Sequence, residues 1–223
     1  MTHYKPRSSV AEQYRTIRTS LQFMGSRRHT KVIMVTSALP QEGKTTTASN
    51  LAIVFAQQDC RVLLIDADLR KPTFHQIFQT ENNSGLSKLL YNGGSLEEGV
   101  HPTGIYQLDL LPSGPIPPNP VELLSWERMD LILREARDLY DYIIVDTPPV
   151  LPVADALILA QKCDGVVLVV SSGKTGIPEI LKVKEVLTQS GARLLGTIIN
   201  RKRRKSKEVG YRYYGNIDKG YPV

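Results

Sequence analysis

Residues 38–46, with the sequence ALPQEGKTT, lie directly between an apolar run, KVIMVTS, and a segment of helical character. They match the phosphate-binding pattern GxxxxGK followed by Ser or Thr at every position except the first, where Ala38 replaces glycine. In such a loop the backbone N–H groups and the start of the following helix bind phosphates. The chain is therefore expected to form a strand, a tight loop and a helix here, around a nucleoside triphosphate and Mg²⁺.

The residue types of this loop suit that ligand. Gly43 lets the backbone approach closely, Lys44 reaches the β- and γ-phosphates, and Thr45 is a ligand for Mg²⁺. The nucleotide is expected to contact six consecutive residues: Gln41, Glu42, Gly43, Lys44, Thr45 and Thr46. The alternative is a chance GKTT in an ordinary loop, and the flanking strand and helix argue against it.

The remainder of the chain alternates between β-rich apolar runs and helical segments. The runs are KVIMVTS, RVLLIDAD, YQLDLLPS, YDYIIVDTPP, GVVLVVSS and LLGTIIN. Strands so continuously apolar are buried on both faces. Their alternation with helices predicts an α/β fold, a P-loop NTPase-like and mostly parallel sheet with helices on both faces. Ligands of such sheets bind at the carboxyl ends of the strands. The proline-rich PSGPIPPNP is interpreted as an ordered loop before a helix that begins near Val121.

Three carboxylates follow strands and so fall at that edge. Asp146 ends the run YIIVD and suits the acidic position beside the magnesium shell, although it can also simply cap a turn. Asp66 and Asp68 end the run LLIDAD, and residues two apart in a strand share a face. One can hold Mg²⁺ through water while the other accepts a proton from a hydroxyl. The alternative is that one caps a helix and the other pairs with Arg70.

The segment SSVAEQYRTIRTSLQFM predicts an amphipathic helix capped by a serine that precedes Val10. Its apolar face is expected to hold Val10, Tyr14, Ile17 and Leu21. Glu12, Arg15 and Arg18 lie on another strip of the same helix. That strip is either a solvated surface with local ion pairs or a contact between subunits.

The net charge of +6 is concentrated at the C-terminus. From Arg201 onward there are eight Lys or Arg residues against Glu208 and Asp218, so residues 1–200 hold twenty charges of each sign. Such a basic end is either solvated or in contact with anionic lipid, nucleic acid or an acidic protein surface. Cys60 and Cys163 are expected to be reduced residues in or near the core of a cytosolic protein.

No apolar run approaches the roughly twenty residues that a membrane span requires, and no signal peptide is visible. Membrane association is therefore expected only through a partner or the tail. That tail, KSKEVGYRYYGNIDKGYPV, carries four tyrosines between glycines and charges: Tyr211, Tyr213, Tyr214 and Tyr221. They either pack against an edge of the domain, form a docking patch, or are exposed for chemical modification.

Together, ALPQEGKTT, LLIDADLRKP and YIIVDTPP resemble the Walker A, A′ and B motifs of the bacterial tyrosine kinases that control capsule and exopolysaccharide synthesis. EQYRTIRTSLQF matches the ExxRxxR oligomerisation motif of that family, and SGPIPPNPVELL and the tyrosine cluster match as well, so the resemblance spans nearly the whole chain. It is closest to the stand-alone form, in which the kinase is a separate chain from its transmembrane activator. The resemblance implies a kinase domain over residues 1–200, with an oligomerisation helix within residues 1–25, and a flexible tail over residues 201–223.

The resemblance also implies roles for single residues. Lys44 and Thr45 bind ATP and Mg²⁺, Asp68 and Asp146 belong to the magnesium shell, and Asp66 is the base that takes the tyrosine proton. Spacing alone does not choose Asp66 over Asp68. The four tail tyrosines become phosphoacceptors, presented in trans to a neighbour in a ring-shaped homo-oligomer, an octamer, held partly by the ExxRxxR helix.

The activator implied by the resemblance is a transmembrane protein of the polysaccharide co-polymerase type whose cytoplasmic end completes the site. The chain would then be cytoplasmic, peripheral to the membrane through that activator, and would act on protein substrates to regulate polysaccharide synthesis and export. No nucleic-acid partner is expected.

The chain departs from the family pattern in two places. Gln41 stands where relatives commonly have glycine, which is costly if the position needs a positive φ, and the tail has only four tyrosines. Two other functions remain as alternatives. One is a deviant Walker-type ATPase of the partitioning or division-site class, but Leu39 occupies the position of its second loop lysine. The other is a non-catalytic nucleotide-binding assembly factor.

Overall fold

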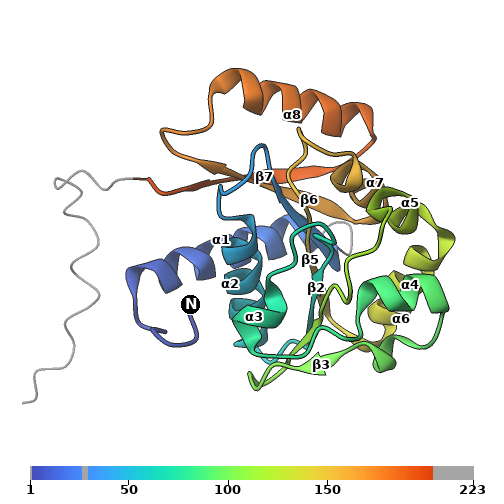
Figure 1. Cartoon of the computed structure of the whole chain (residues 1–223). Helices are drawn as coiled ribbons and strands as arrows, with labels where there is room; N and C mark the ends of the chain where they lie inside the picture. The colour runs from blue at the N-terminus through green and yellow to red at the C-terminus, as the bar shows by residue number, and fades with distance from the viewer. Residues whose placement is uncertain (1, 27–29, 203–223) are drawn as a thin grey trace, which may run out of the picture.

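The computed structural model describes residues 2–26 and 30–202 (Figure 1). The four tail tyrosines, Tyr211, Tyr213, Tyr214 and Tyr221, lie outside these ranges, as does most of the predicted tail over residues 201–223. The predicted division into a domain and a tail therefore stays a prediction.

Over the described ranges the chain forms one seven-stranded sheet in the order β3-β4-β2-β5-β1-β6-β7. The strands are β1 Val32–Ser37, β2 Val62–Asp66, β3 His101–Pro102, β4 Leu108–Leu111, β5 Tyr142–Asp146, β6 Gly165–Ser171 and β7 Leu194–Asn200. All pairings are parallel except that of β3 with β4. The six predicted strands and the mostly parallel sheet are confirmed. The short edge strand β3 was not predicted, because two residues carry no periodicity.

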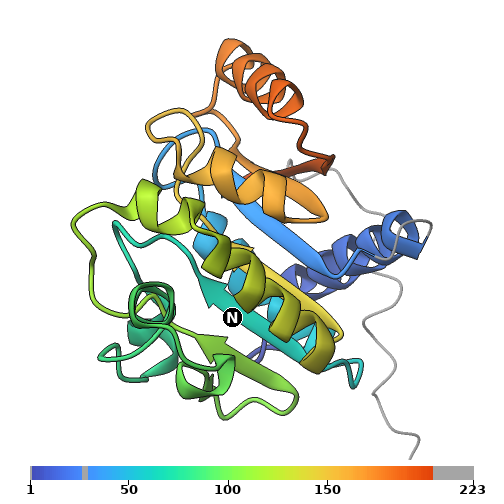
Figure 2. The same cartoon turned by 90° about the vertical axis from the view of Figure 1, so that its right-hand side faces the viewer.

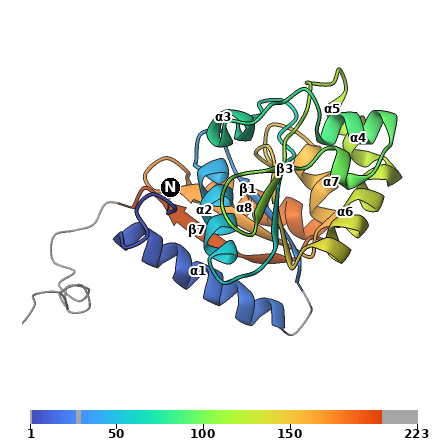
Figure 3. The same cartoon turned by 90° about the horizontal axis from the view of Figure 1, so that it is seen from below.

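Helices cover both faces of the sheet, as predicted. They are α1 Ser9–Ser26, α2 Lys44–Ala56, α3 Phe74–Phe78, α4 Leu86–Asn92, α5 Pro120–Ser125, α6 Glu127–Leu139, α7 Asp155–Lys162 and α8 Ile177–Gln189, with a 3₁₀ turn η1 at Leu96–Glu98. One apolar core joins the sheet to side chains of α1, α2 and α3, and a second core joins it to side chains of α4 to α8. Figures 2 and 3 show α6 and α7 on one side of the sheet and α1 and α2 on the other.

The central strand β1 shows why its sequence is continuously apolar. Val32 and Met34 belong to one core, while Ile33 and Val35 belong to the other, and all four are at most 1% exposed. Successive side chains of a strand point to opposite faces, so a strand covered on both sides needs apolar residues at every position. Each such side chain contributes about 1.5–3 kcal/mol through burial.

Helix α1 packs as predicted at Tyr14, Ile17 and Leu21, which all contact an apolar core, but not at Val10. Ser8 caps it as expected, because its Oγ accepts the N–H of Ala11 at 3.1 Å. Val10 was expected on the buried face but is 54% exposed, whereas Ala11 is fully buried and Leu21 is 4% exposed. At the first turn the small side chain of Ala11 faces the domain instead of Val10, a difference that tertiary contacts set and the four-residue spacing alone does not.

The other expectations concern redox state and membranes. Cys60 and Cys163 are both unpaired and half-buried, each packed against an apolar core, as predicted. Across the described ranges, no helix has both the length and the apolar character needed to cross a membrane.

Candidate active site

The three sequence-predicted carboxylates and the phosphate loop meet at the carboxyl edge of the sheet. The strands β2, β5 and β1 are neighbours in that order, so the ends of all three lie together. Asp66 and Asp146 are partners in the register of β2 and β5. The phosphate loop leaves β1 beside them. The predicted convergence of these segments is therefore present in the fold.

The phosphate loop contains two residues in the left-handed region. Gly43 has φ 96° and Gln41 has φ 64°, and α2 begins directly after them at Lys44. A glycine adopts such angles without steric cost, whereas a glutamine is strained by roughly 1 kcal/mol or more. The concern raised by Gln41 is thus justified, because the loop does need a positive φ at that position.

Lys44 lies across the acidic side chains. Its Nζ is 2.7 Å from Asp68 Oδ2, 3.5 Å from Asp146 Oδ2 and 3.2 Å from Thr45 Oγ1. Burial lowers the pKa of Lys44, but the negative charges of Asp146 and Asp68 outweigh it, so the net shift of this pKa is upward. The ammonium therefore stays charged, as a phosphate-binding lysine must.

Thr45 and Asp146 form a second contact in the site. The Thr45 hydroxyl donates to Asp146 Oδ2 at 2.7 Å. Asp146 Oδ1 is buried and has no hydrogen-bond partner within the described ranges. Burial raises the pKa of Asp146 to about 7, the charge of Lys44 opposes this shift, and the nearby Asp66 adds to it. A hydroxyl and an uncompensated carboxylate oxygen side by side form a donor set suited to a hard cation.

Asp66 is also buried and only half satisfied. Its Oδ2 accepts the backbone N–H groups of Thr73 at 3.0 Å and Phe74 at 3.1 Å, while Oδ1 has no partner in the described part of the chain. Burial raises the pKa of Asp66 to about 6, against the lowering effect of those two N–H groups. This carboxylate holds the start of α3, and it also keeps one oxygen available for a proton.

The alternative considered for the paired aspartates holds in part. Asp66 does receive the first N–H groups of a short helix, α3. Arg70, however, does not pair with Asp68: it makes two bonds to the fully buried Asp155, at 2.9 and 3.0 Å. Asp68 instead contacts Lys44 and accepts the N–H of Lys71. Asp155 was missed, because nothing local marks the first residue of α7 as a partner of Arg70.

Glu42 points away from the ligand position. Glu42 is 0% exposed. Its carboxylate accepts a hydrogen bond from the N–H of Leu39 at 2.8 Å and another from the hydroxyl group of Thr175. Asn200 donates to the Glu42 carbonyl at 2.9 Å. The side chain of Glu42 therefore braces the loop, although its backbone remains available to phosphate. Thr175 and Asn200 were missed. The signal for both was their position at this sheet edge, where Asn200 ends one predicted strand and Thr175 follows another.

The oxygen atoms of Thr45 and Asp146 suit a magnesium ion that is bound together with phosphate, and they do not form a metal site made of protein ligands alone. Among the described residues, no three His, Cys, Asp or Glu side chains converge to hold a metal by themselves. Mg²⁺ usually takes only one or two protein oxygens and completes its shell with phosphates and water. Thr45 Oγ1 and Asp146 Oδ1, which has no partner in the described part of the chain, match that requirement.

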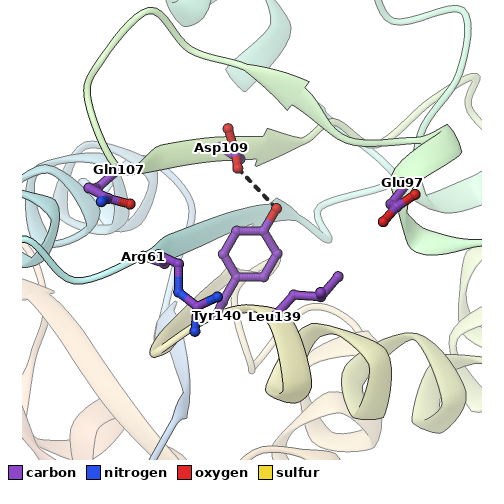
Figure 4. A pocket seen from close by; sticks show the side chains of 6 residues that line it. All are labelled: Arg61, Glu97, Gln107, Asp109, Leu139 and Tyr140. Carbon is purple, nitrogen blue, oxygen red and sulfur yellow. Dashed lines mark hydrogen bonds between the residues drawn. The ribbon is translucent and has the colours of Figure 1, made fainter.

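A cavity of about 270 Å³ lies at the opposite edge of the sheet, between η1, strand β4 and the residues before β2 and β5 (Figure 4). In it the Tyr140 hydroxyl donates to Asp109 at 3.0 Å. A second hollow of about 330 Å³ lies between Arg70 and the start of α5. Neither hollow includes the phosphate loop, so the candidate site rests on the side-chain cluster rather than on a deep pocket.

Known proteins resemble this chain over nearly its whole length. A family model for an AAA domain matches residues 30–194. Tyrosine-protein kinase YwqD of Bacillus subtilis is 53% identical over 214 residues, covering 96% of this chain and 90% of that protein. Putative tyrosine-protein kinase CapB of Staphylococcus aureus is 37% identical, covering 96% and 93%. Tyrosine-protein kinase Etk of Escherichia coli is 39% identical, covering 87% of this chain but only 27% of its own length.

Solved structures agree with this. The chimerical protein CapA2B2 superposes with a TM-score of 0.87 at 39% identity, covering 91% of this chain and 89% of that one. The kinase domain of Escherichia coli Etk gives a TM-score of 0.87 at 37% identity, covering 93% and 83%. The cell division ATPase MinD of Pyrococcus furiosus gives 0.68 at 23% identity over 79% of this chain and 74% of that one, a likeness in fold alone.

Proposed function

The chain belongs to the family of bacterial tyrosine-protein kinases, and we propose that it transfers the γ-phosphoryl group of ATP, with Mg²⁺, to tyrosines of its own C-terminal segment in trans. The proposal rests mainly on the position and burial of Asp66. It is a buried carboxylate, one oxygen of which has no hydrogen-bond partner among the described residues, at the sheet edge shared by Lys44, Thr45 and Asp146. A site that only binds nucleotide has no need of this additional base.

The chain's own residues suggest a division of labour. Lys44 exchanges its contact with Asp68 for the β- and γ-phosphates, while the N–H groups at the start of α2 receive phosphate oxygens. Thr45 and Asp146 would hold Mg²⁺, with Asp68 in its outer shell. When bound, Mg²⁺ would neutralise charge on the transferred group.

Asp66 then acts as the general base. The tyrosine oxygen forms a bond to the γ-phosphorus, the bond from that phosphorus to the ADP oxygen breaks, and the phenolic proton moves to Asp66 Oδ1. With a pKa of about 6, Asp66 is mostly ionised at neutral pH and can accept this proton. Burial keeps competing water away from the carboxylate.

The acceptors are Tyr211, Tyr213, Tyr214 and Tyr221. Each lies at least eleven residues beyond Asn200, the end of β7, and Asn200 contacts the phosphate loop. The described chain therefore reaches the active-site edge at Asn200, just before this segment begins. Glycines at 210, 215 and 220 would let it adapt to a neighbour's site.

Assembly and location follow as parts of the same proposal. A ring-shaped homo-oligomer, an octamer, would present each tail to the next subunit, with α1 in the contact. Glu12 and Arg15 form an exposed ion pair on α1, whereas Arg18 is 8% exposed and donates to Val54 O of α2. Glu12→Ala with Arg15→Ala is therefore the clean test: light scattering should show a smaller species, and an unchanged mass would remove this surface from the interface.

A transmembrane activator is the proposed partner, and the chain would act at the cytoplasmic side of the membrane through it, regulating capsular or exopolysaccharide synthesis and export. Two observations support a partner. The relative Etk is much longer than the part that this chain matches, and CapA2B2 is a chimera of two components. The ATPase-switch and assembly-factor alternatives are less favoured, since the relatives that cover nearly the whole chain are named tyrosine kinases.

The test mixes two full-length variants with γ-labelled ATP and Mg²⁺. Lys44→Met should lose catalysis but keeps its tail, and the fourfold Tyr→Phe variant at 211, 213, 214 and 221 should keep catalysis but lose its acceptors. Label on the tail of the Lys44→Met chain supports transfer in trans. Lys88→Met, an exposed change on α4, is the matched control and should behave as the wild type. Rapid release of free phosphate without phosphotyrosine would contradict the kinase proposal.

A further inference from the structure

The phosphate loop is held from outside by side chains that belong to none of the family motifs described above. Lys174 and Thr175 follow β6, and Asn200 ends β7. Because β1, β6 and β7 are neighbours, these segments reach the carboxyl edge beside the loop that leaves β1. We propose that Lys174, Thr175 and Asn200 form a loop clamp, a set of positioning residues that holds the phosphate loop in the shape that binds nucleotide.

Each member of the loop clamp contacts the backbone or side chain of a different part of the loop. Lys174 Nζ donates to Pro40 O at 2.9 Å, and Asn200 Nδ2 donates to Glu42 O at 2.9 Å. These two bonds fix the carbonyl groups on either side of Gln41. Gln41 is the loop residue held at φ 64°. A strained backbone of this kind persists only where its surroundings over-determine it.

Thr175 is the central member because it acts through a buried charge. Its hydroxyl donates to the carboxylate of Glu42, and the second oxygen of that carboxylate accepts the N–H of Leu39. Thr175 Oγ1 itself accepts the N–H of Ser171 at 2.9 Å. Glu42 is 0% exposed, so water cannot replace the hydroxyl if it is removed.

Asn200 also occupies space above the loop. A Cβ placed on Gly43 would lie 2.1 Å from Asn200 Nδ2. The glycine of the phosphate motif therefore serves two purposes: it permits φ 96°, and it leaves room for the clamping amide. The last residue of β7 thus packs directly on Gly43, the loop residue that precedes α2.

The kinetic consequence of the loop clamp is specific. Without the loop clamp, only a fraction of the molecules would hold the phosphate loop in the conformation that binds ATP. The apparent dissociation constant for ATP is the intrinsic constant divided by that fraction, so it rises. Chemistry at saturating ATP is unchanged, because bound nucleotide selects the competent loop. A hydrogen bond to a buried charge is worth about tenfold in an equilibrium constant, or about 1.4 kcal/mol. Thr175→Val should therefore raise Kd and KM for ATP about tenfold and leave kcat nearly unchanged.

The experiment titrates the full-length protein with a fluorescent ATP analogue and measures tail phosphorylation against ATP concentration. Thr175→Ser, which keeps the hydroxyl, should restore wild-type binding. Thr188→Val is the matched control, because Thr188 makes its hydroxyl bond within α8, to Lys184 O at 2.8 Å. Glu42→Gln, which keeps the size of the side chain, should weaken binding in the same direction and provides a second variant if Thr175→Val does not fold.

A double-variant cycle tests the link to the strained residue. Gln41→Gly removes the steric cost of the positive φ, so Thr175→Val in that background should weaken binding by less than about threefold. If Thr175→Val still weakens ATP binding tenfold in the Gln41→Gly background, the loop clamp does not act by holding Gln41. Equal affinity of wild type and Thr175→Val would overturn the loop clamp itself. The inference rests on the proposed nucleotide binding, and the two are separable: a wild type that binds no nucleotide contradicts that binding instead.

Discussion

Replacing Asp66 with asparagine should make the ligand-free chain more stable while it abolishes phosphoryl transfer. The buried carboxylate has a pKa of about 6, against 3.8 for a free one. At 1.36 kcal/mol per unit, this shift of roughly two units means that the ionised Asp66 destabilises the fold by about 3 kcal/mol at pH 7.5. Removing the charge removes that cost.

The asparagine side chain should fit the same place. Its carbonyl oxygen can accept the N–H groups of Thr73 and Phe74, as Asp66 Oδ2 does. Its amide would take the place of Oδ1, which has no partner within the described ranges, at a cost of about 1–2 kcal/mol. The net stabilisation is then about 1–2 kcal/mol. For a chain of this size that corresponds to a rise in Tm of about 2–8 °C.

The sign with pH follows from the same shift. Between pH 3.8 and about 6 the folded state keeps a proton on Asp66 that the unfolded state has lost. Stability that is present below pH 3.8 is therefore lost as the pH rises through about 6. Asp66→Asn should remove this pH dependence. The slope of the unfolding free energy against pH should then change by the equivalent of up to one bound proton. The slope due to Asp146, whose pKa is about 7 in the wild type, should become smaller but persist, because Asp66 contributes to that shift and burial is its larger cause.

The assay is thermal and urea unfolding from pH 4 to 8, in EDTA and without nucleotide, together with a separate measurement of tail phosphorylation. Transfer by Asp66→Asn should fall by about 10²–10⁴-fold. Asp68→Asn is the matched control, because Asp68 contacts the Lys44 ammonium at 2.7 Å, and this change should instead destabilise by about 1–3 kcal/mol. A lower Tm for Asp66→Asn than for the wild type at pH 7.5, or full activity, would refute the reasoning.

Two further predictions concern the supports of the site. Arg70→Met should lower the free energy of unfolding, measured in urea, by about 3 kcal/mol, because it leaves the fully buried Asp155 unpaired. Adding Asp155→Asn should restore at least half of that loss. If nothing is restored, the buried charge of Asp155 is not the cause. Arg18→Met should lower the free energy of unfolding by about 1–2 kcal/mol in the same assay, since it removes the hydrogen bond to Val54 O. Arg15→Met, which removes an exposed ion pair, should lower it by less than about 0.5 kcal/mol. Equal losses would contradict the different roles of these two arginines.

The sequence alone determined the sheet and the position of its active edge. Apolar runs such as GVVLVVSS predict strands buried on both faces, and the loop ending in Gly43 and Lys44 predicts the turn from β1 into α2. Parallel strands bring their carboxyl ends to one edge. The meeting of Asp66 and Asp146 there follows from local patterns, because each of them directly ends an apolar run.

Only the tertiary structure decided where individual polar side chains point. Glu42 lies in the motif, yet its carboxylate turns inward, because Thr175 reaches it from a segment more than 130 residues away. Arg70 pairs with Asp155 and not with the nearby Asp68. Arg18 faces α2, while Arg15 contacts Glu12 and Pro6 O at the surface of the helix. Strand and helix formation depends on residues close in sequence, which a periodic pattern records. The direction of a charged side chain depends on which distant group can satisfy it, and only the packed fold supplies that group.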